Sequence, residues 1–298
     1  MIADPNFRFR DLFPDCPIPT IVDVGAGDHP GDVIGMSEME KLADQGDAMV
    51  IGFDGADASI ETVRNRANAH RRYVQAFVGD GSERTFYRTN NPLTGSLYKP
   101  DRSLVDEFNN LGAIMKVVEE IPVRTVALDD LDEIEDFDGI KLDVQGAELD
   151  VLRGAQTKLA GCNIVVTEVE FIPIYEGQAL YGDIERFLME QGFLLHFMPR
   201  TAQRMLWPTK PGATKIANLG SQSVWTDVVF TRDFRTFGAI SVDKLWKLAL
   251  IIHDCFRFFD TVSRILFVID EKTGAKAYPR YVDHLRRNSA AAEPKTEG

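Results

Sequence analysis

The sequence predicts an α/β fold, in which a mostly parallel sheet is covered by helices on both faces. Short apolar runs rich in β-branched residues alternate with turns and with stretches of helical spacing, the pattern that builds such sheets. Acidic residues stand where several of the apolar runs end. With 44% hydrophobic and 27% charged residues, the 298-residue chain has a globular composition and can bury one large core.

The individual elements follow in order from local patterns. The apolar run 20–24 is the first expected strand and 48–54 the second, with helical spacing at 33–43 between them. A helix at 60–69 leads to a third strand at 73–78. The later elements are strand 139–144, helix 148–159, strand 163–170, helix 183–191 closed by Gly192, and strands 193–198 and 223–231 with a hairpin-like connection. We therefore expect a sheet of seven strands.

The main domain is expected to span 20–238, with two long interruptions at 81–120 and 199–222. Insertions at one end of such a sheet are often functional loops, so both are candidates for a substrate pocket. The remaining segments are an N-terminal segment 1–19, a helical extension 239–287, and a tail 288–298 with the composition of a disordered segment.

The helical extension has an apolar stripe at helical spacing, formed by Leu245, Leu248, Ala249, Ile252, Phe256, Phe259 and Ile265. The stripe either packs against its own domain or forms a homodimer interface. Charged residues interrupt the most apolar part, 245–269. We expect no membrane span there, because a span needs about 18 uninterrupted apolar residues.

The charge and the cysteines limit the partners and the location. A formal net charge of −13 disfavours a nucleic-acid partner, because affinity for the phosphate backbone depends on lysine and arginine. Cys16, Cys162 and Cys255 lack the spacing of a metal site and are expected to be reduced core residues. The first ten residues lack the apolar stretch of a secretory signal, so we expect a cytoplasmic location.

A glycine-rich turn follows the first expected strand. Asp23 lies near the end of the strand, and Gly25, Ala26 and Gly27 form a turn that can present backbone amides to a ligand. Pro30 stands where the dinucleotide fingerprint has its third glycine, which disfavours a nicotinamide cofactor. The carboxylate of Asp23 suits a cationic group and would repel a pyrophosphate. A purely structural turn is the alternative.

Two further acids follow the next two expected strands. Asp54 closes the second strand, where an acid accepts hydrogen bonds from ribose hydroxyls, unless it only caps the following helix. Gly79 and Asp80 close the third strand, and Asp80 either accepts a hydrogen bond from an adenine amino group or makes an ordinary turn. Together with Asp23, these acids favour a nucleoside with a charged amino-acid tail.

A second group of charged residues follows the fourth and fifth expected strands. Lys141 and Asp143 share one face of the fourth strand, because side chains alternate along a strand. Glu148 lies in the first turn of the next helix, where the macrodipole favours an acid. Glu168 and Glu170 point to one side of the fifth strand. Such a cluster could position an acceptor hydroxyl, take its proton or hold a divalent ion.

The sequence resembles the FkbM family of S-adenosylmethionine-dependent methyltransferases. The resemblance rests on VDVGA at 22–26, GSL at 95–97, VRTVALDD at 123–130, IKLDVQGAELDVLRGA at 140–155, EVE at 168–170 and YEG at 175–177. It implies a Rossmann-like class I methyltransferase domain that binds S-adenosylmethionine and methylates a hydroxyl of a sugar, polysaccharide or natural product. It also implies that Ser96 touches the cofactor or the acceptor. Members commonly have an acid where this chain has Gln145, which weakens a catalytic role at that position.

The strand-end acids are also similar to those of metal-dependent macrolide-sugar O-methyltransferases. By that similarity Asp143, Glu168 and Glu170 would bind Mg²⁺, which prefers carboxylate and water oxygens. The alternative is Asp143 or Glu168 acting as a base without a metal, with Lys141 tuning the site electrostatically. His29, just past the glycine turn, is either another base or a solvated loop residue.

Two competing functions are weighed against this one. A non-catalytic partner subunit of a glycan or natural-product assembly system would keep the same fold, but the intact acids disfavour it. An NAD-dependent sugar dehydrogenase is disfavoured by Pro30 and by the lack of a Tyr-x-x-x-Lys pair. The first insertion contains aromatic residues and arginines that would either line a sugar pocket or pack a lid: Phe86, Tyr87, Tyr98, Phe108, Arg84, Arg88 and Arg102.

Overall fold

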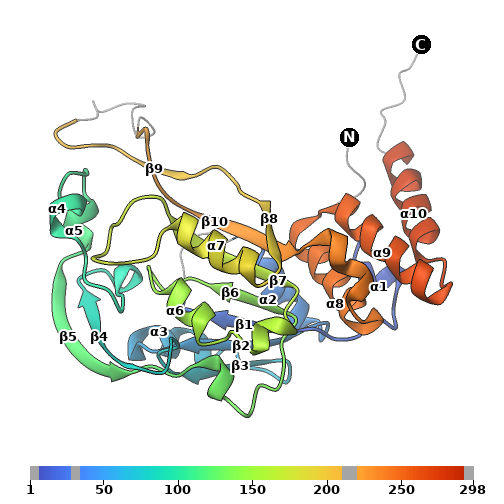
Figure 1. The fold of residues 1–298 in the computed structure, drawn as a ribbon, viewed down its shortest axis with the longest axis horizontal. Helices are drawn as coiled ribbons and strands as arrows, with labels where there is room; N and C mark the ends of the chain where they lie inside the picture. The colour runs from blue at the N-terminus through green and yellow to red at the C-terminus, as the bar shows by residue number, and fades with distance from the viewer. Residues whose placement is uncertain (1–6, 28–33, 210–219, 292–298) are drawn as a thin grey trace.

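The computed structural model describes residues 7–27, 34–209 and 220–291. The strands of its main sheet are β1 Thr20–Val24, β2 Met49–Asp54, β3 Arg71–Gln75, β6 Gly139–Leu142, β7 Ile164–Glu170, β8 Phe193–Phe197, β9 Ala202–Arg204 and β10 Gln222–Arg232. Their order is β3-β2-β1-β6-β7-β10-β8, with β9 paired to β10 (Figure 1). The first five strands of this order are parallel, and β10 runs antiparallel to β7 and β8. The expected α/β fold is confirmed, and β9 adds a strand to the seven predicted.

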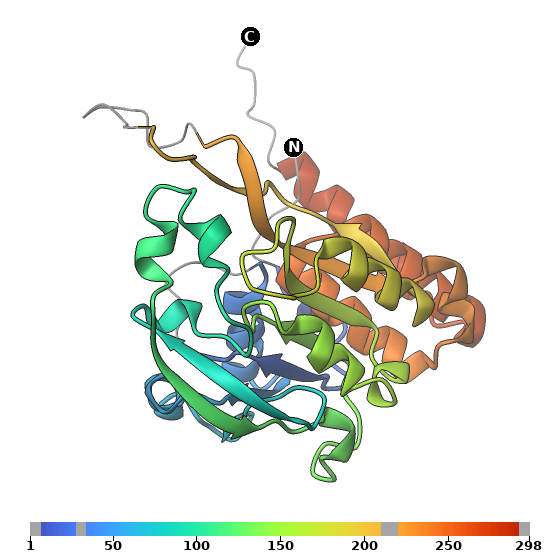
Figure 2. The same cartoon turned by 60° about the vertical axis from the view of Figure 1, so that its left-hand side comes forward.

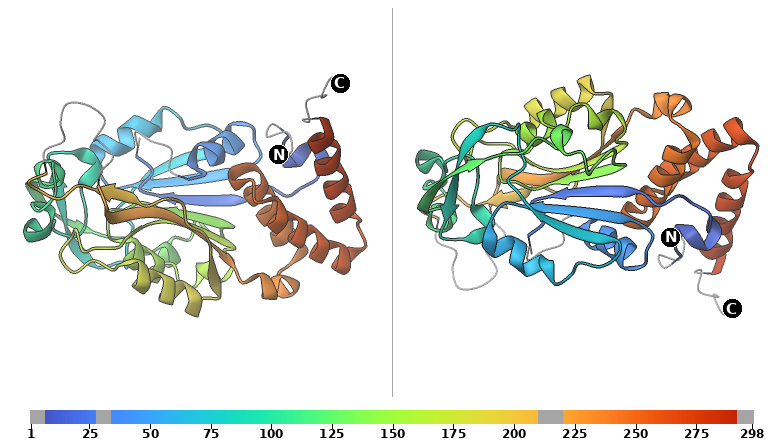
Figure 3. Two further views of the ribbon diagram at one scale, coloured as in Figure 1. Left: turned by 90° about the horizontal axis from the view of Figure 1, so that it is seen from above. Right: turned by 90° about the horizontal axis from the view of Figure 1, so that it is seen from below.

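Helices cover both faces of the sheet (Figure 3), with α2 Met36–Asp44 and α3 Asp57–Arg64 on one face and α6 Glu148–Arg153 and α7 Tyr181–Glu190 on the other. Neighbouring residues of β1 enter different cores because strand side chains alternate. Ile21 packs in the core that includes α2, and Val22 in the core that includes α6 and α7. Helix α6 ends at Arg153, before the expected residue 159. The next residue is Gly154, and glycine is a weak helix former. Gly154 lies so close to Gly79 that a Cβ on Gly154 would be 2.0 Å from the carbonyl oxygen of Gly79.

The first insertion forms its own structure beside the main sheet. Strands β4 Glu83–Thr89 and β5 Val117–Arg124 pair as a separate antiparallel ribbon (Figure 2). Between them lie the 3₁₀ turn η1 Pro92–Thr94 and the short helices α4 Arg102–Val105 and α5 Leu111–Ile114. Val105, Phe108 and Leu111 form a small core with Tyr175 and Val224, which fixes the insertion to the carboxyl ends of β7 and its neighbours.

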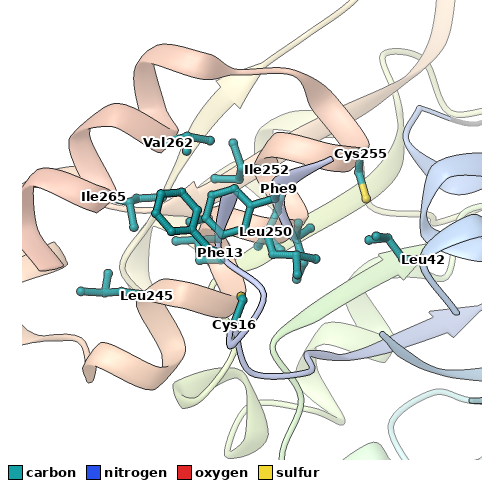
Figure 4. Close-up of a cluster of buried hydrophobic side chains, with 14 of the residues drawn as sticks. Phe9, Phe13, Cys16, Leu42, Leu245, Leu250, Ile252, Cys255, Val262 and Ile265 are labelled. Atoms are coloured by element: carbon teal, nitrogen blue, oxygen red, sulfur yellow. The ribbon is translucent and has the colours of Figure 1, made fainter. Parts of the chain in front are cut away.

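The helical extension lies at the opposite end of the molecule from α4 and α5 (Figure 1). It comprises the turn η4 Phe234–Ala239, α8 Val242–Ile251, the π-helical turn η5 Ile252–Phe256, α9 Phe259–Thr273 and α10 Ala277–Ala291. The N-terminal helix α1 Phe9–Leu12 packs into it, and Figure 4 shows Phe9 and Phe13 among Leu245, Leu250 and Ile265. None of the described helices is long and apolar enough to cross a membrane.

The structure bears on two expectations for this end of the chain. Leu245, Leu248, Ala249, Ile252 and Ile265 of the apolar stripe are fully buried inside the chain's own core. The stripe therefore packs against its own domain. These five side chains are not exposed for a homodimer through the C-terminal helices. Helix α10 also continues through 288–291, which the sequence analysis had assigned to a disordered tail, and the rest of that tail lies outside the described residues.

The remaining short turns connect elements of the main sheet. They are η2 Leu128–Asp130, before β6, and η3 Lys158–Ala160, before β7. Lys158 donates hydrogen bonds to the carbonyls of Leu128 and Leu131 at 2.6 and 2.8 Å, so the two turns are held together.

Candidate functional site

The glycine turn after β1 is held against the ends of β2 and β6. The amides of Gly25 and Ala26 both donate to the carbonyl of Phe53, each at 2.9 Å. Gly25 has φ +80°, and a Cβ at this position would lie 1.9 Å from the carbonyl oxygen of Asp143. Only glycine fits both the backbone conformation and this close approach. Residues His29 and Pro30, which the sequence analysis singled out, lie outside the described residues.

A cavity of about 350 Å³ opens above this turn. Its polar lining includes Gly25, Gly27, Asp54, Ser96 and Asp143, five of the residues expected at the site. The carboxylate of Asp54 accepts the amides of Gly27 at 3.2 Å and of Ala56 at 2.9 Å, so its position at the end of β2 is fixed. Its apolar lining comes from Phe53, Ala76, Phe77, Val78, Phe86, Leu93 and Leu97. We call this the cofactor cavity.

Beneath the turn lies a buried ion pair. Lys141 Nζ is 3.3 Å from Asp23 Oδ1, 3.9 Å from Asp143 Oδ2 and 3.1 Å from the carbonyl oxygen of Gly25. Burial lowers the pKa of Lys141, but the neighbouring carboxylates of Asp23 and Asp143 outweigh it and the net pKa is raised. Asp23, Ala26 and Lys141 do not line the cofactor cavity. The ion pair of Asp23 with Lys141 lies beneath the turn, and an interaction of Asp23 with a cationic ligand, directly or through a water, stays a prediction.

The third expected acid also lies away from the cavity. Strand β3 ends at Gln75, earlier than the sequence suggested, and Val78 then bridges to Val126. Asp80 is exposed and accepts the amide of Ser82 at 3.0 Å, and the hydrogen bonds from Ser82 lower the pKa of its carboxyl. Asp80 therefore makes the ordinary turn that was the alternative, and neither it nor Gly79 lines the cofactor cavity.

Two aromatic residues, Phe77 and Phe86, line the cofactor cavity near the end of β3. Phe77 and Phe86 pack with ring centroids 4.9 Å apart, and both line the cofactor cavity. Phe86 had been expected either to line a sugar pocket or to pack a lid, and Phe77 had not been assigned a role in the site. Their apolar rings fit the flat base of a nucleoside.

A second cavity of about 340 Å³ adjoins the first. Leu93, Asp143 and Gln145 line both cavities. The second cavity is lined in addition by Asn91, Thr94, Leu111, Ile114, Met115, Glu168, Glu170, Ile174, Tyr175, Arg204 and Trp225. Asp143 thus lies where the two cavities meet.

Gln145 connects the charged groups at this junction. Its Nε2 donates to Asp143 Oδ1 at 3.0 Å and to Glu168 Oε2 at 2.7 Å, and its Oε1 accepts a hydrogen bond from Tyr175 Oη at 3.0 Å. Its carbonyl oxygen accepts from Ser96 Oγ at 2.6 Å. The backbone at Gln145 is left-handed, with φ +56°. The sequence analysis gave this residue too little weight, because its neighbours in space come from three other segments.

The donor set does not fit the Mg²⁺ site that was expected at Asp143, Glu168 and Glu170. A cation between Asp143 and Glu168 would occupy the place where the amide of Gln145 donates a hydrogen to each carboxylate. In the described ranges there is no group of three histidine, cysteine or acidic side chains that could hold a metal ion. The prediction of Mg²⁺ is not supported.

Burial raises the pKa of three acids at this edge, Glu148, Glu168 and Glu170. Burial, then the nearby charge of Asp143, raises the pKa of Glu168 well above its usual range, and burial likewise raises that of Glu170. Burial raises the pKa of Glu148 to about 7, and its Oε1 accepts the amides of Val144 at 2.9 Å and Gly146 at 3.2 Å. Glu148 therefore stabilises the turn around Gln145 rather than contacting a ligand.

The arginines expected from the first insertion have partners within the protein. Arg84 Nη2 and Tyr98 Oη each donate to Asp150 at 2.7 Å, and Arg88 pairs with Glu119 across the β4–β5 ribbon. Arg102 pairs with Asp106, and Phe108 is buried. Tyr87 pairs with Glu120 in the ribbon. The cation that lines the second cavity is instead Arg204, on β9 in the other insertion.

Comparison with known proteins identifies the family of the chain. A family model described as the methyltransferase FkbM domain matches residues 23–195, more than half of the chain. In fold comparison, a ribosomal protein L11 methylase from Lactobacillus delbrueckii subsp. bulgaricus is 13% identical, with 73% of this chain and 71% of that chain covered and a TM-score of 0.33. An uncharacterized protein from Listeria monocytogenes serotype 4b is 8% identical, with 92% and 93% covered and a TM-score of 0.34. No protein of curated function matches the sequence. The chain belongs to the FkbM family of methyltransferases, for which S-adenosylmethionine is the implied cofactor.

Proposed function

We propose that this protein is an S-adenosylmethionine-dependent O-methyltransferase that acts on a hydroxyl of a sugar, polysaccharide or natural product. The observation that carries the proposal is that Asp143 and Gln145 line both cavities. A reaction between a cofactor in one cavity and an acceptor in the other would take place at this junction. When bound, S-adenosylmethionine supplies a methyl group activated by its sulfonium.

The residues of the cofactor cavity suit a nucleoside with an amino-acid tail. In the proposal, Asp54 accepts hydrogen bonds from the ribose hydroxyls, and the apolar wall with Phe77 and Phe86 holds the base. Gly25 and Gly27 let the backbone approach the ligand closely. Ser96 lines the same cavity, while its hydroxyl is engaged with Gln145.

Asp143 is the base that the electrostatics favour. Lys141, 3.9 Å from its carboxylate, favours the ionised form, whereas Glu168 has a raised pKa and tends to hold its proton. When an acceptor oxygen receives the methyl group that S-adenosylmethionine would supply, its proton would pass to the carboxylate of Asp143. Displacement at a methyl group is an in-line reaction, so its rate depends on how the acceptor is oriented. The hydrogen bond from Gln145 holds the carboxylate of Asp143 in place and would contribute to this orientation.

Calorimetry with S-adenosylmethionine tests the cofactor half of the proposal. The native chain should bind, and Asp54→Asn should bind at least tenfold more weakly, because the amide offers one acceptor oxygen in place of two. Asp80→Asn is the matched control: this acid also follows a strand, but it lies outside the cavity, so affinity should not change. Absence of binding to the native chain would favour the non-catalytic partner subunit instead.

A screen of sugars and polysaccharides with labelled S-adenosylmethionine tests the acceptor half. Label should enter the acceptor, and nuclear magnetic resonance of the product should show an O-methyl ether. Transfer only to nitrogen or carbon would overturn the O-methyltransferase assignment.

The proposal includes a cytoplasmic location, which the cysteines support. Cys16, Cys162 and Cys255 are free and buried. Burial raises the pKa of both Cys16 and Cys162 to about 12, so these thiols stay protonated. They behave as core residues, in keeping with a reducing compartment.

A further inference from the structure

Arg204 is a half-buried cation that lines the second cavity. It ends β9, opposite Gln222 of β10, and its guanidinium carbon lies 4.4 Å from the centre of the Trp225 ring. Both side chains line the second cavity. Burial lowers the pKa of Arg204, which remains a cation because its ordinary pKa is so high. Among the described residues, no carboxylate or other acceptor forms a hydrogen bond or an ion pair with this guanidinium.

This situation differs from that of the other arginines near the site. Arg84 and Arg88 each have a carboxylate partner at 2.7 Å, and Arg102 donates to a carbonyl at 2.6 Å. A guanidinium that is partly removed from water without a counter-ion is unfavourable, and an incoming anion relieves that cost through strong, charge-assisted hydrogen bonds. The stacked Trp225 ring holds the fork of Arg204 in one orientation, which favours a bidentate carboxylate or phosphate.

We infer that the acceptor of this enzyme is an anionic hydroxyl compound, whose carboxylate or phosphate binds Arg204 while its hydroxyl meets Asp143. The inference rests on the proposed function and adds the charge of the substrate. Glu168 and Glu170 also line this cavity, and their raised pKa values reduce the negative charge that an anion would meet between Arg204 and Asp143.

The strand order gives the spacing. Asp143 directly follows β6, and β7 and β10 separate β6 from β9. The registers place Asp143 level with Asp227 of β10, whereas Arg204 pairs with Gln222, five residues farther along that strand. Three strand intervals of about 4.8 Å and five residues of about 3.4 Å put the two backbones about 22 Å apart. The long side chain of Arg204 and the carboxylate of Asp143 both reach the cavity between them. The remaining gap suits one sugar ring with a charged substituent rather than a methyl acceptor such as a small alcohol.

The test compares three probes that differ in charge: D-glucuronate, D-glucose 6-phosphate and D-glucose. Binding is measured by saturation-transfer nuclear magnetic resonance and titration at low salt, with the enzyme saturated by S-adenosylhomocysteine. In the native chain, at least one anionic probe should bind about tenfold more tightly than glucose. The better of the two anions identifies carboxylate or phosphate as the recognised group.

Variants of Arg204 then locate the effect. Arg204→Gln should remove the preference for the anion, with the affinity for glucose and for S-adenosylhomocysteine unchanged. Arg204→Lys, which keeps the charge but loses the fork, should retain part of the preference. The matched control is Arg200→Gln, the same change of charge at an exposed position on the same connection, which should retain all of it.

The outcomes separate this inference from the proposed function. A chain that does not bind S-adenosylhomocysteine fails as a methyltransferase, whatever the sugars do. A chain that binds it but shows no preference for either anion, or whose preference survives in Arg204→Gln, overturns the anionic acceptor alone. If Arg204→Gln lowers the melting temperature and S-adenosylhomocysteine affinity together, Arg204→Lys decides: full loss of the preference in a stable Arg204→Lys chain contradicts recognition through charge.

Discussion

Two clusters of buried polar groups lie at opposite ends of this protein and do different work. The junction cluster, at the carboxyl ends of β1, β6 and β7, consists of Asp23, Lys141, Asp143, Gln145 and Glu168. The terminal cluster, in the helical extension, consists of His253, Asp254, Arg257 and Tyr281 with the backbone of Phe7 and Phe9. Both contain ionisable side chains with shifted pKa values.

The terminal cluster is enclosed by apolar side chains and binds only the chain itself. His253 Nδ1 is 2.8 Å from Tyr281 Oη and its Nε2 is 3.3 Å from the carbonyl of Phe7, to which Arg257 donates at 3.0 Å. Asp254 accepts the amide of Phe9 at 3.0 Å. The junction cluster instead adjoins two cavities. Burial and a shifted pKa therefore do not identify a functional site by themselves; the adjoining space does.

The largest effect is expected from removing the base of the junction cluster. Asp143→Asn keeps the shape of the side chain and its hydrogen bond with Gln145 but cannot take a proton. Turnover should fall by about 10²- to 10⁴-fold, the usual contribution of a general base, while S-adenosylmethionine affinity changes much less. Rates measured under saturating cofactor check this, and turnover within threefold of the native enzyme would exclude Asp143 as the base.

The next effect compares two glycines with the same backbone conformation, one in each region. Gly25 and Gly274 have φ +80° and +75°, but a Cβ would clash with Asp143 only at Gly25, and at Gly274 nothing lies within 4 Å. Gly274→Ala should lower the free energy of unfolding by about 1 kcal/mol, from backbone strain alone. Gly25→Ala should lower it by about 3 kcal/mol or more and abolish cofactor binding. Urea unfolding and calorimetry measure both, and equal losses would show that the contact with Asp143 is relaxed easily.

A third prediction concerns the amide between the two carboxylates. Gln145→Glu replaces the donor by a further acid between Asp143 and Glu168, the oxygen-rich arrangement that a divalent cation prefers. The melting temperature of the variant should rise with Mn²⁺ or Mg²⁺, by an amount equivalent to about 1–3 kcal/mol at saturating metal. The native chain should respond much less. An equal response in both chains would show that Gln145 does not take the place of a cation.

The smallest effect tests the terminal cluster through its pH dependence. Burial lowers the pKa of His253 to about 4, so its contribution to stability is lost as pH falls from 6.5 towards 4. Burial raises the pKa of Asp254 to about 6, so its contribution is present at low pH and lost as pH rises from 3.8 through 6. The two oppose each other in the native chain.

Asp254→Asn removes only the second contribution and keeps an oxygen to accept the Phe9 amide. Between pH 7 and 4, the variant should lose about 2 kcal/mol more unfolding free energy than the native chain. Denaturant unfolding at both pH values measures this. Methyl transfer at pH 7 should be unchanged, and a matching loss of turnover would mean that the two clusters are coupled.

The sequence predicted those parts of the site that depend on local patterns. The β-branched run 20–24 coincides with β1, and the glycines after it form the expected turn against β2. Asp54 lies at the cofactor cavity because its strand ends where the apolar run ends. Asp80 does not, because β3 pairs from Arg71 and leaves the sheet early, a register that local hydrophobicity does not determine.

Other parts depended on contacts that no local pattern reveals. Arg204 and Trp225 meet only because β9 pairs with β10 across the second insertion. Gln145 was interpreted from its position in the sequence alone. Its role follows from its hydrogen bonds with Glu168 on β7 and with Tyr175 in the loop after that strand. A carboxamide between two acids becomes meaningful only when the folded chain brings the acids together.

The attachment of α1 to the helical extension has a consequence for synthesis of the chain. His253 and the carbonyl of Phe7 are 246 residues apart in sequence, so the segment around Phe7 has to wait for a partner that is synthesised much later. Until the extension emerges, Ile164, Val166 and Val229 of the main sheet lack the apolar side chains of α8 and α9 that share their core. Contacts this distant in sequence slow folding and leave apolar surface exposed in the meantime. A nascent chain of this protein is therefore most in need of a chaperone until its helical extension has emerged from the ribosome.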